Sequence, residues 1–329
     1  MNISTPNSSY HRPVLLRETL DALSIGPGDR CIDATVGDGG HTMSLLEATG
    51  PNGQLLGIDA DPKALERARE RLHPFAGRLT LVNDNFANLE NIVARNRFYP
   101  VLAILMDLGL SSWQLEDGGR GFSFREEVPL DMRLSPTQPI NASDLVNAFT
   151  TEDLAKMIAT YGEEPQARRI ARSIVYHRPI QTALQLAQAI EAAVPRRGRR
   201  LHPATRAFLA IRIVVNKELE NLESALSQAL RVLTKGGRLA VIAYHSLEDR
   251  IVKTFMRREA KDCICPPEQP QCICGHRATL TILNRKVIKP GQDEIRDNPR
   301  ARSARLRVCS ALGQPVKNEE RVQVEGGSR

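Results

Sequence analysis

The sequence lacks a long, uninterrupted hydrophobic run. The most apolar helical stretch, residues 207–215, contains Arg212, and the first ten residues are small and polar. A membrane span needs about 20 consecutive apolar residues, and a secretory signal needs an apolar segment near the N-terminus. We therefore expect neither feature, and we predict a cytoplasmic protein that does not act at a membrane.

Cysteine is also scarce, with six residues in a chain of 329. This number excludes a disulfide scaffold of the kind that small secreted proteins use. Four of the six form two Cys-Ile-Cys pairs close together in the chain: Cys263, Cys265, Cys272 and Cys274. The single residue inside each pair is less than the two to four that are typical of zinc ribbons. A structural zinc and a redox-active thiol hairpin both remain open, but the spacing favours an unligated loop, and we expect no metal.

Acidic residues are nearly missing from one long segment. Residues 165–212 contain ten arginines and a single acid, Glu191, whereas the whole chain has 45 basic and 38 acidic residues. Residues 285–307 have eight basic residues against three acids. Such concentrated positive charge is typical of segments that contact nucleic-acid phosphates. We predict one contact at Pro195-Arg-Arg-Gly-Arg-Arg200, which has no helical face, and a second at residues 298–305.

A glycine-rich loop follows the first apolar run of the chain. Residues 30–32 are strand-like, Asp33 follows them, and Gly37, Gly39 and Gly40 then lead into a helical pattern. Glycine allows a sharp turn and a close approach of the backbone to a ligand, because it carries no Cβ. The pattern predicts a ligand-binding loop between a strand and a helix.

The acid after the second apolar run indicates a nucleoside ligand. Asp59 lies about 20 residues beyond the loop, where nucleotide-binding α/β folds place an acid against ribose hydroxyls. Thr42 occupies the position of the third glycine of a dinucleotide fingerprint, and no Gly-Lys-Ser or Gly-Lys-Thr is present. Asp33 and Asp38 would repel a pyrophosphate. A cationic nucleoside without phosphate fits better, and S-adenosylmethionine, with its ammonium and sulfonium, is such a cofactor.

Polar or aromatic side chains follow the other predicted strands in the same way. Phe86 comes after the third strand, Asp107 after the fourth, and Tyr244 and His245 after the fifth. The carboxyl ends of parallel strands lie at one edge of a doubly wound sheet, where ligands bind. The sequence therefore predicts an α/β fold with one ligand site at the strand ends. The predicted strands are residues 30–32, 54–58, 79–82, 101–106 and 238–243.

A long segment without strand patterns interrupts this sheet. Helical patterns with proline breaks fill residues 142–209, and this part includes most of the arginine-rich segment. We predict a sheet domain in two parts, residues 1–114 and 213–310, separated by an inserted α-helical substrate-recognition domain, residues 115–212. Residues 311–329 are expected to be disordered.

Several short motifs occur in order between His11 and Arg307. They are Pro13-Val-Leu-Leu, Asp33-Ala-Thr with Gly37-Asp-Gly-Gly-His41, Asp107-Leu-Gly-Leu-Ser-Ser with Gln114-Leu, Arg120-Gly-Phe-Ser-Phe124, Pro129-Leu-Asp-Met-Arg133, His245-Ser-Leu-Glu-Asp-Arg250 and Asn298-Pro-Arg-Ala-Arg-Ser303. In these motifs the sequence resembles the ribosomal RNA small subunit methyltransferase H family. That family methylates the exocyclic N4 of a cytidine in the decoding region of bacterial 16S ribosomal RNA.

The resemblance implies a Rossmann-like, S-adenosylmethionine-dependent methyltransferase sheet with a helical substrate-recognition insertion, and 16S rRNA in the small ribosomal subunit as partner. It implies these cofactor contacts: Gly39, Gly40 and His41 in the loop, Asp59 at the ribose, Phe86 at the adenine, and Asp107 and Gln114 on the far side. The pattern of residues at the strand ends predicts all of these contacts except His41 and Gln114, which only the resemblance implies. The sequence departs from the family's pattern at Phe208-Leu-Ala-Ile-Arg212 and at Leu134-Ser135, both in the insertion, where they bear on RNA contact.

The motif after the fourth strand indicates how the chemistry is assisted. The N4 amine of cytosine is a poor nucleophile, because its lone pair is delocalised into the ring. We expect catalysis mainly by alignment, with backbone carbonyls or Ser111 and Ser112 accepting the amine hydrogens. His245 is either a proton shuttle or a residue that orders its loop. Trp113, the only tryptophan, supports a flipped base or belongs to the core.

Three other functions share parts of this pattern. A nicotinamide oxidoreductase would have the same sheet and Asp59, but the loop lacks the third glycine. A non-catalytic RNA-binding protein would need the arginines and not the acids at the strand ends. A methyltransferase that acts on an amine of another RNA or of DNA is the nearest alternative, and only the resemblance separates it. The assembly stage of the ribosomal substrate and the oligomeric state, monomer or homodimer, stay open.

Overall fold

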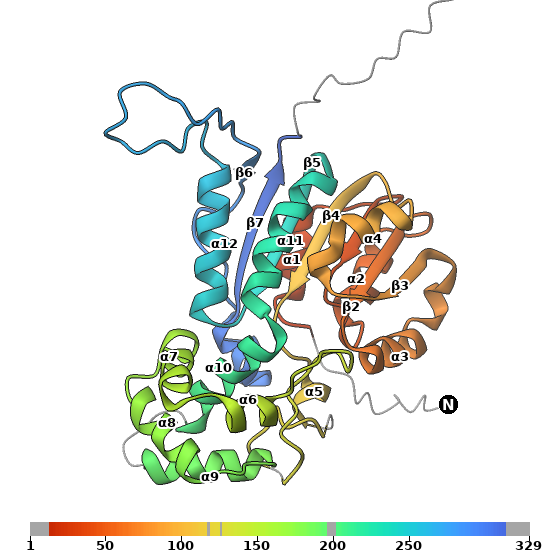
Figure 1. Cartoon of the computed structure of the whole chain (residues 1–329). Coiled ribbons are helices and arrows are strands. Elements are labelled where there is room, and N and C mark those ends of the chain that lie inside the picture. Colours follow the sequence, from red (N-terminus) through yellow and green to blue (C-terminus); the bar gives the residue numbers. More distant parts are fainter. Residues whose placement is uncertain (1–12, 117–118, 126, 196–201, 314–329) are drawn as a thin grey trace, which may run out of the picture.

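Figure 1 shows the computed structural model of the chain, in which a twisted sheet with helices on both faces lies against a separate group of helices. The structure describes residues 13–116, 119–125, 127–195 and 202–313. Two predictions fall outside these residues. They are the phosphate contact of the arginines at 196–200 and the disorder of the tail beyond residue 313, and both stay predictions.

The strands described form one seven-stranded sheet in the order β3-β2-β1-β4-β5-β7-β6. Neighbouring strands from β3 to β5 are parallel, and β7 is antiparallel to β5 and to β6. The predicted α/β fold with a Rossmann-like sheet is confirmed. The strands are β1 (Arg30–Asp33), β2 (Gln54–Asp59), β3 (Leu79–Asn83), β4 (Val101–Asp107), β5 (Leu233–Ala243), β6 (Leu280–Ile282) and β7 (Arg305–Ala311).

The two strands at one edge of the sheet, β6 and β7, were not predicted. β6 has only three residues, too few for a periodic pattern. Arg305 in β7 is the last residue of the segment expected to contact phosphate, and Arg307 lies just beyond it, but the two form ion pairs of 2.9 and 2.7 Å with Asp249. These two arginines therefore stabilise the fold instead of being free for RNA. β7 also continues to Ala311, so that residue is not part of a disordered tail.

The helices cover both faces of the sheet, and none of those described is long and apolar enough to cross a membrane. They are α1 (Leu16–Leu23), α2 (Gly40–Ala48), α3 (Pro62–Arg71), α4 (Leu89–Arg95), α5 (Ser112–Glu116), α6 (Ala142–Ala148), α7 (Thr151–Gly162), α8 (Ala167–Tyr176), α9 (Ala183–Ala193), α10 (Ala204–Asn216), α11 (Glu218–Val232), α12 (Ser246–Glu259) and α13 (Gln292–Asp297). Short 3-10 turns are η1 (His73–Arg78), η2 (Phe86–Asn88) and η3 (Pro299–Ser303).

The central strand β4 is buried on both faces, as its nearly continuous apolar sequence predicts. Ile104 and Met106 pack into a cluster with α4, α11 and α12. Ala103 and Leu105 pack into the cluster on the other face, with α1, α2 and α3. Successive side chains of a strand point to opposite faces, so these two clusters hold the sheet as a middle layer.

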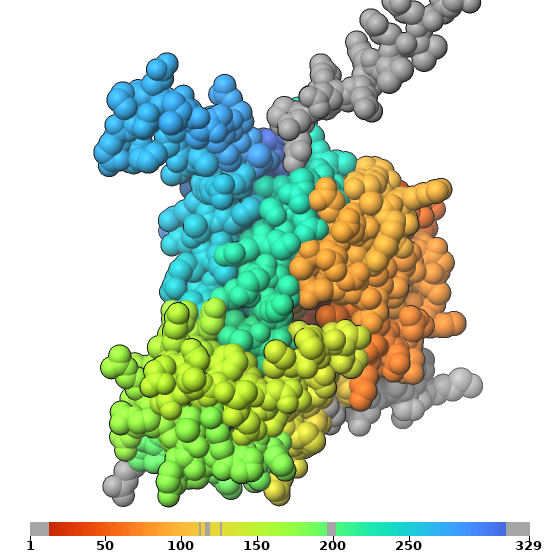
Figure 2. All heavy atoms as spheres, in the orientation of Figure 1, coloured from red at the N-terminus to blue at the C-terminus, as the bar shows by residue number. Residues whose placement is uncertain are grey.

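Helices α6 to α10 have a hydrophobic core of their own. Ile158, Ile170, Ile190 and Ile211 are fully buried in one cluster, which contains no strand residue. In Figure 1 these helices lie together beyond one end of the sheet, and in Figure 2 the yellow-green part of the chain forms a lobe beside the rest. α10 continues to Asn216, four residues past the boundary predicted at 212. We call α6 to α10 with the preceding residues 119–141 the helical lobe.

Candidate active site

The carboxyl ends of the central strands open onto one large cavity. Asp59 and Asp107 are the last residues of β2 and β4, and residues 34–38 follow β1 between them. The strand order changes direction between β1 and β4, which is where doubly wound sheets bind ligands. The cavity has a volume of about 810 Å³ and is lined by both the strand ends and the helical lobe. This volume is in the range of cofactor sites.

Most residues of the predicted site line this cavity. The lining includes Gly40, His41, Asp59, Phe86, Asp107, Ser111, Gln114 and His245. Gly39 is not part of it. Ser112 is the first residue of α5, but its side chain lies outside the described part of the chain. The sequence predicted that Asp33, Asp59, Phe86 and Asp107, from four strand ends, share one cavity. Asp59, Phe86 and Asp107 line it, but Asp33 does not.

The glycine loop between β1 and α2 depends on positive backbone angles and close packing. Gly37 has a φ of +51°, and Gly39, the N-cap of α2, has a φ of +76°. Residues other than glycine rarely adopt such values. A Cβ on Gly40 would lie 2.6 Å from Cγ of Pro13. The segment that precedes α1 therefore covers the loop, and the loop backbone itself forms one wall of the cavity.

The carboxylate of Asp59 holds this loop in place. Its Oδ2 accepts a hydrogen bond of 2.8 Å from the backbone N–H of Gly37, and its Oδ1 accepts one of 2.9 Å from that of Asp61. Burial raises the pKa of Asp59 to about 6, although the two backbone hydrogen bonds oppose this. Each carboxylate oxygen keeps a lone pair for a ligand hydroxyl.

Asp107 is the most strongly perturbed carboxylate of the cavity. Burial raises its pKa to about 7, and the negative charges of Asp33 and Glu248 add to the effect, whereas a hydrogen bond from Tyr244 opposes it. The Tyr244 hydroxyl donates to Oδ1 of Asp107 over 2.8 Å. Among the described residues, no lysine or arginine forms an ion pair with Asp107 or Asp59, and Asp107 has only the neighbouring His41. A cationic ligand would offset this uncompensated negative charge.

His41 lies beside Asp107 and is neutral. Burial lowers its pKa to about 4, against a hydrogen bond with the backbone of Val14. Its Nε2 lies 3.5 Å from Oδ2 of Asp107 and has no hydrogen-bond partner among the described residues. An orphaned, buried ring nitrogen at a cavity wall is suited to a polar ligand group. Nothing in the local sequence of α2 marks this histidine; only the family resemblance does.

Asp33 does not line the cavity, in contrast to the expectation from its strand end. Its carboxylate is fully buried and accepts hydrogen bonds from the Thr35 N–H (3.1 Å) and the Thr42 hydroxyl (2.7 Å). Thr42, which replaces the third glycine of a dinucleotide loop, is thus a structural partner of this acid. Asp33 acts on the cavity through its charge, which raises the pKa of Asp59 and of Asp107.

A buried polar network connects the sheet to the helical lobe, and sequence reasoning missed it. Asp61 accepts hydrogen bonds from the Lys63 N–H at the start of α3 and from Nε2 of Gln114 (2.9 Å). Arg120 forms an ion pair with Asp61, and it also donates to the carbonyls of Arg133 (3.2 Å) and Leu134 (3.0 Å). Asp61 is the N-cap of α3, but its partners Gln114 and Arg120 lie more than 50 residues away in the chain.

His245 caps α12 instead of standing free in the cavity. Its Nδ1 accepts a hydrogen bond of 3.4 Å from the Glu248 N–H, and its Nε2 lies 3.1 Å from Oε1 of Glu248. Glu248 in turn accepts from the backbone N–H groups of Tyr244 and His245. Although burial raises the pKa of Glu248, the hydrogen bond and charge of His245 and the charge of Arg212 lower it overall. Nδ1 serves the cap of α12, whereas Nε2, beside Glu248, has no hydrogen-bond partner among the described residues. The capping geometry favours the loop-ordering role of His245.

The helical lobe supplies an aromatic wall. The ring of Phe124 stacks on His202 at 4.2 Å and meets Phe208 edge-on at 5.5 Å. Phe124 and Phe208 line the cavity. Trp113 does not line it, and the Arg67 guanidinium lies over its ring at 5.2 Å, so Trp113 is not placed to support a flipped base.

Arg212, the most deeply buried cation of the lining, is already paired. It donates two hydrogen bonds of 2.7 and 2.8 Å to the carboxylate of Glu218. Arg212, the last arginine of the arginine-rich segment, is therefore part of the cavity wall and is not available to contact phosphate. Arg206 on α10 is 44% exposed, but it is paired too, because its guanidinium lies 3.6 Å from the Glu164 carboxylate and donates to the Glu163 carbonyl over 3.0 Å.

Carboxylates at the ends of parallel strands, a glycine loop and an adjacent aromatic wall define a Rossmann-like enzyme with a nucleoside-type cofactor. The chain belongs to the MraW methylase family, whose sequence profile matches residues 8–312. It is thus an S-adenosylmethionine-dependent methyltransferase, and the predictions of family, enzyme class and cofactor are confirmed.

Curated relatives share about half of their residues with this chain. "Ribosomal RNA small subunit methyltransferase H" of Dehalococcoides mccartyi is 54% identical over 305 residues, 93% of this chain and 87% of that one. The protein of the same name from Thermomicrobium roseum is 50% identical over 313 residues, 94% of this chain and 96% of that one. Among solved structures, an rRNA methylase from Streptococcus thermophilus aligns with a TM-score of 0.41 and 12% identity over 95% of this chain and 99% of that one.

Proposed function

We propose that this chain transfers a methyl group from S-adenosylmethionine to the exocyclic N4 of a cytidine in the decoding region of 16S rRNA, in the cytoplasm. The observation that carries the proposal is the cavity in which two strand-end carboxylates, Asp59 and Asp107, with no lysine or arginine partner among the described residues, meet the aromatic wall of the helical lobe. The carboxylates suit a cationic cofactor, and the aromatic side chains suit a flat base. The names of the close relatives point to ribosomal RNA.

The cofactor residues divide by chemistry. Asp59 has lone pairs for the ribose hydroxyls, and Phe86, half-buried at the start of η2, offers a ring face to the adenine. His41 and Asp107 would hold the cationic amino-acid end, because one has an orphaned nitrogen and the other an uncompensated charge. Gln114 would contact the cofactor on the same side as His41 and Asp107, and its amide is oriented by the hydrogen bond that it donates to Asp61.

The protein assists the reaction by alignment and by accepting hydrogen bonds. S-adenosylmethionine supplies an electrophilic methyl group on a sulfonium. Ser111 Oγ lies in the lining and accepts a hydrogen bond of 3.3 Å from the Gln114 N–H, which leaves one lone pair for an amine hydrogen. Withdrawing amine hydrogens into such bonds restores lone-pair density on N4, and the side chains of the helical lobe that line the cavity displace water from it.

Methylation of isolated small ribosomal subunits tests the proposal. Subunits from cells that lack this activity, incubated with the full chain and labelled S-adenosylmethionine, should gain one methyl group, which mass analysis of 16S fragments should locate at N4 of a decoding-region cytidine. Methylation of another nucleobase, of DNA or of a different RNA instead would overturn the target. Failure to bind S-adenosylmethionine in equilibrium dialysis, with NAD as comparison ligand, would overturn the cofactor site.

We expect Phe86→Ala to weaken binding of S-adenosylmethionine by about 10- to 100-fold, the loss of roughly 1.5–3 kcal/mol of aromatic contact. Phe75→Ala is the matched control, because Phe75 is also a partly buried ring that packs on the sheet but does not line the cavity. Titration calorimetry measures both. Equal losses of affinity in the two variants would show that the effect is loss of folding, and that Phe86 is no cofactor contact.

A further inference from the structure

A long loop between α12 and β6 has no hydrophobic core. Residues 260–279 contain no helix or strand, and nearly all are exposed or only partly buried. The loop projects from the far end of α12, away from the helical lobe (Figure 1). Its isoleucines Ile264 and Ile273 are 37% and 77% exposed. Such a loop needs another source of order, since burial supplies little.

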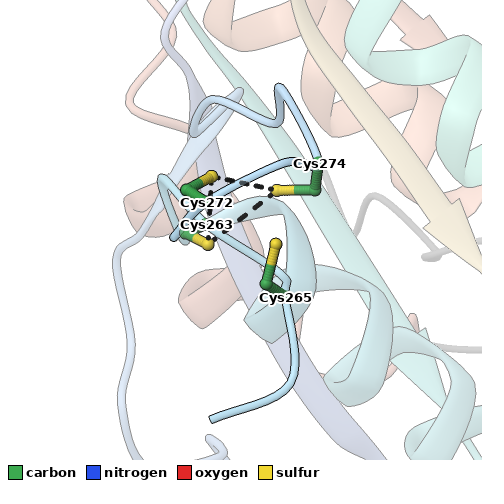
Figure 3. A group of neighbouring side chains, drawn as sticks. All are labelled: Cys263, Cys265, Cys272 and Cys274. Atoms are coloured by element: carbon green, nitrogen blue, oxygen red, sulfur yellow. Dashed lines mark hydrogen bonds between the residues drawn. The ribbon is translucent and has the colours of Figure 1, made fainter. Parts of the chain in front are cut away.

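The four cysteines of the two Cys-Ile-Cys pairs meet in this loop, as Figure 3 shows. Cys263, Cys272 and Cys274 are exposed, although cysteine is among the residues most often buried in proteins. The two other cysteines of the chain, Cys31 and Cys309, are buried in the core. Packing in the core therefore explains the presence of Cys31 and Cys309, but it does not explain the four cysteines of the loop.

The sulfur positions have the dimensions of a tetrahedral metal site. The four Sγ atoms all lie within 4.8 Å of one another. Three of the separations are 3.4 Å (Cys263 to Cys272), 3.6 Å (Cys272 to Cys274) and 3.8 Å (Cys274 to Cys263). A disulfide needs a separation of about 2.05 Å. Four thiolates around one zinc, each at about 2.3 Å, lie about 3.8 Å apart.

We propose that Cys263, Cys265, Cys272 and Cys274 bind one structural Zn²⁺. The tight spacing within each pair, which favoured an unligated loop in the sequence, is overcome by the fold, because the two pairs face each other across the loop. Because all four Sγ atoms lie within 4.8 Å of one another, they are too close together for a cluster of several irons, whose ligands bind different metal atoms and lie further apart. All four thiols lose their protons on binding.

The surrounding backbone supports this site. The Ile264 N–H donates a hydrogen bond of 3.5 Å to Sγ of Cys274, which stabilises a thiolate. The base of the loop is closed by the Thr279 N–H, which donates to the Glu259 carbonyl over 2.8 Å, and by the Ala278 N–H, which donates to Asp262 over 3.3 Å. The ends of the loop are thus fixed, and the ion would order the part between them.

The role of the metal is structural. None of the four cysteines lines the cavity. α12 has 14 residues and separates its N-cap His245, in the cavity lining, from the loop by about 20 Å. Zinc would therefore order the loop without taking part in methyl transfer.

Metal analysis of the purified full chain tests the proposal. After desalting through a chelating resin, plasma mass spectrometry should find one zinc per chain, and the four loop thiols should react with a thiol reagent only after a strong chelator is added. Replacement by Co²⁺ should give the absorption bands of a tetrahedral thiolate site. Substoichiometric zinc, iron in its place, or disulfides among the four cysteines would each overturn the assignment.

A double variant with one ligand removed from each pair, Cys265→Ser with Cys272→Ser, should lose the zinc, and its loop should become sensitive to protease. Cys309→Ala is the control and should keep one zinc per chain. Binding of S-adenosylmethionine should persist in both proteins, which shows that the chain is folded. Retention of stoichiometric zinc by the double variant would overturn the ligand set, independently of whether the methyl-transfer proposal holds.

Discussion

Asp107→Asn should weaken binding of S-adenosylmethionine by about 10- to 100-fold at pH 8, since it removes a charge that faces a cationic ligand in a desolvated site. The pKa of Asp107 is raised to about 7. Below that pH the carboxyl is mostly neutral, so the affinity of the parent protein should fall about tenfold between pH 8 and pH 6. Calorimetric titration at both pH values measures this effect, and the variant should lack it.

Tyr244→Phe is the matched control for this assignment. The Tyr244 hydroxyl donates to Asp107 and thereby opposes the rise of its pKa. Without that hydrogen bond the pKa of Asp107 should rise further, and the fall in affinity should begin at a higher pH. If the two variants and the parent protein share one pH profile, Asp107 does not control cofactor binding.

Asp107→Asn should also stabilise the enzyme when no cofactor is bound. A carboxyl whose pKa is higher in the folded state than in the unfolded state binds its proton more tightly when folded. Ionisation of Asp107 therefore costs stability, and this cost grows as pH rises from about 4 to about 7 and is constant above. Asp107→Asn should gain roughly 1–3 kcal/mol in the free energy of unfolding at pH 8, and less at pH 5. Urea denaturation without cofactor measures both values.

Arg120→Ala should destabilise the protein by about 3 kcal/mol and loosen the helical lobe, because it leaves Asp61 as a buried charge without its cation. Asp61 is 1% exposed, and Arg120 is its ion-pair partner. Arg120 also holds the carbonyls of Arg133 and Leu134, at the cavity edge of the lobe. Denaturation measures stability, and protease sensitivity of residues 119–141 measures local loosening.

A double-mutant cycle separates the ion pair from lost packing. Asp61→Asn removes the buried charge but keeps an oxygen that can accept from the Lys63 N–H. If the charge is the main cause, Arg120→Ala should cost much less in the Asp61→Asn background than alone. Additive losses would mean that Arg120 acts through its packing over the Phe122 ring, at 5.6 Å, and its hydrogen bonds to the carbonyls of Arg133 and Leu134, and not through Asp61.

The sequence alone determined where the site lies. Apolar runs that end in Asp59, Asp107 or the residues before Phe86 predicted parallel strands with their polar ends together, and the sheet places them at one cavity. This works because a buried strand leaves a strong local pattern, and because the loops that follow parallel strands all lie at the same edge of the sheet. The glycine loop was predictable too, because its positive backbone angles require glycine and so leave a mark in the sequence.

Tertiary structure decided which polar groups serve the fold and which face the ligand. Asp33 turns inward to Thr42, Arg305 and Arg307 pair with Asp249, and the two Cys-Ile-Cys pairs meet across their loop. Each outcome depends on partners that are distant in the chain or on the path of the backbone between them. A local pattern records the burial and periodicity of a segment, but it carries no information about the opposite charge or thiol that folding brings within 3–4 Å of it.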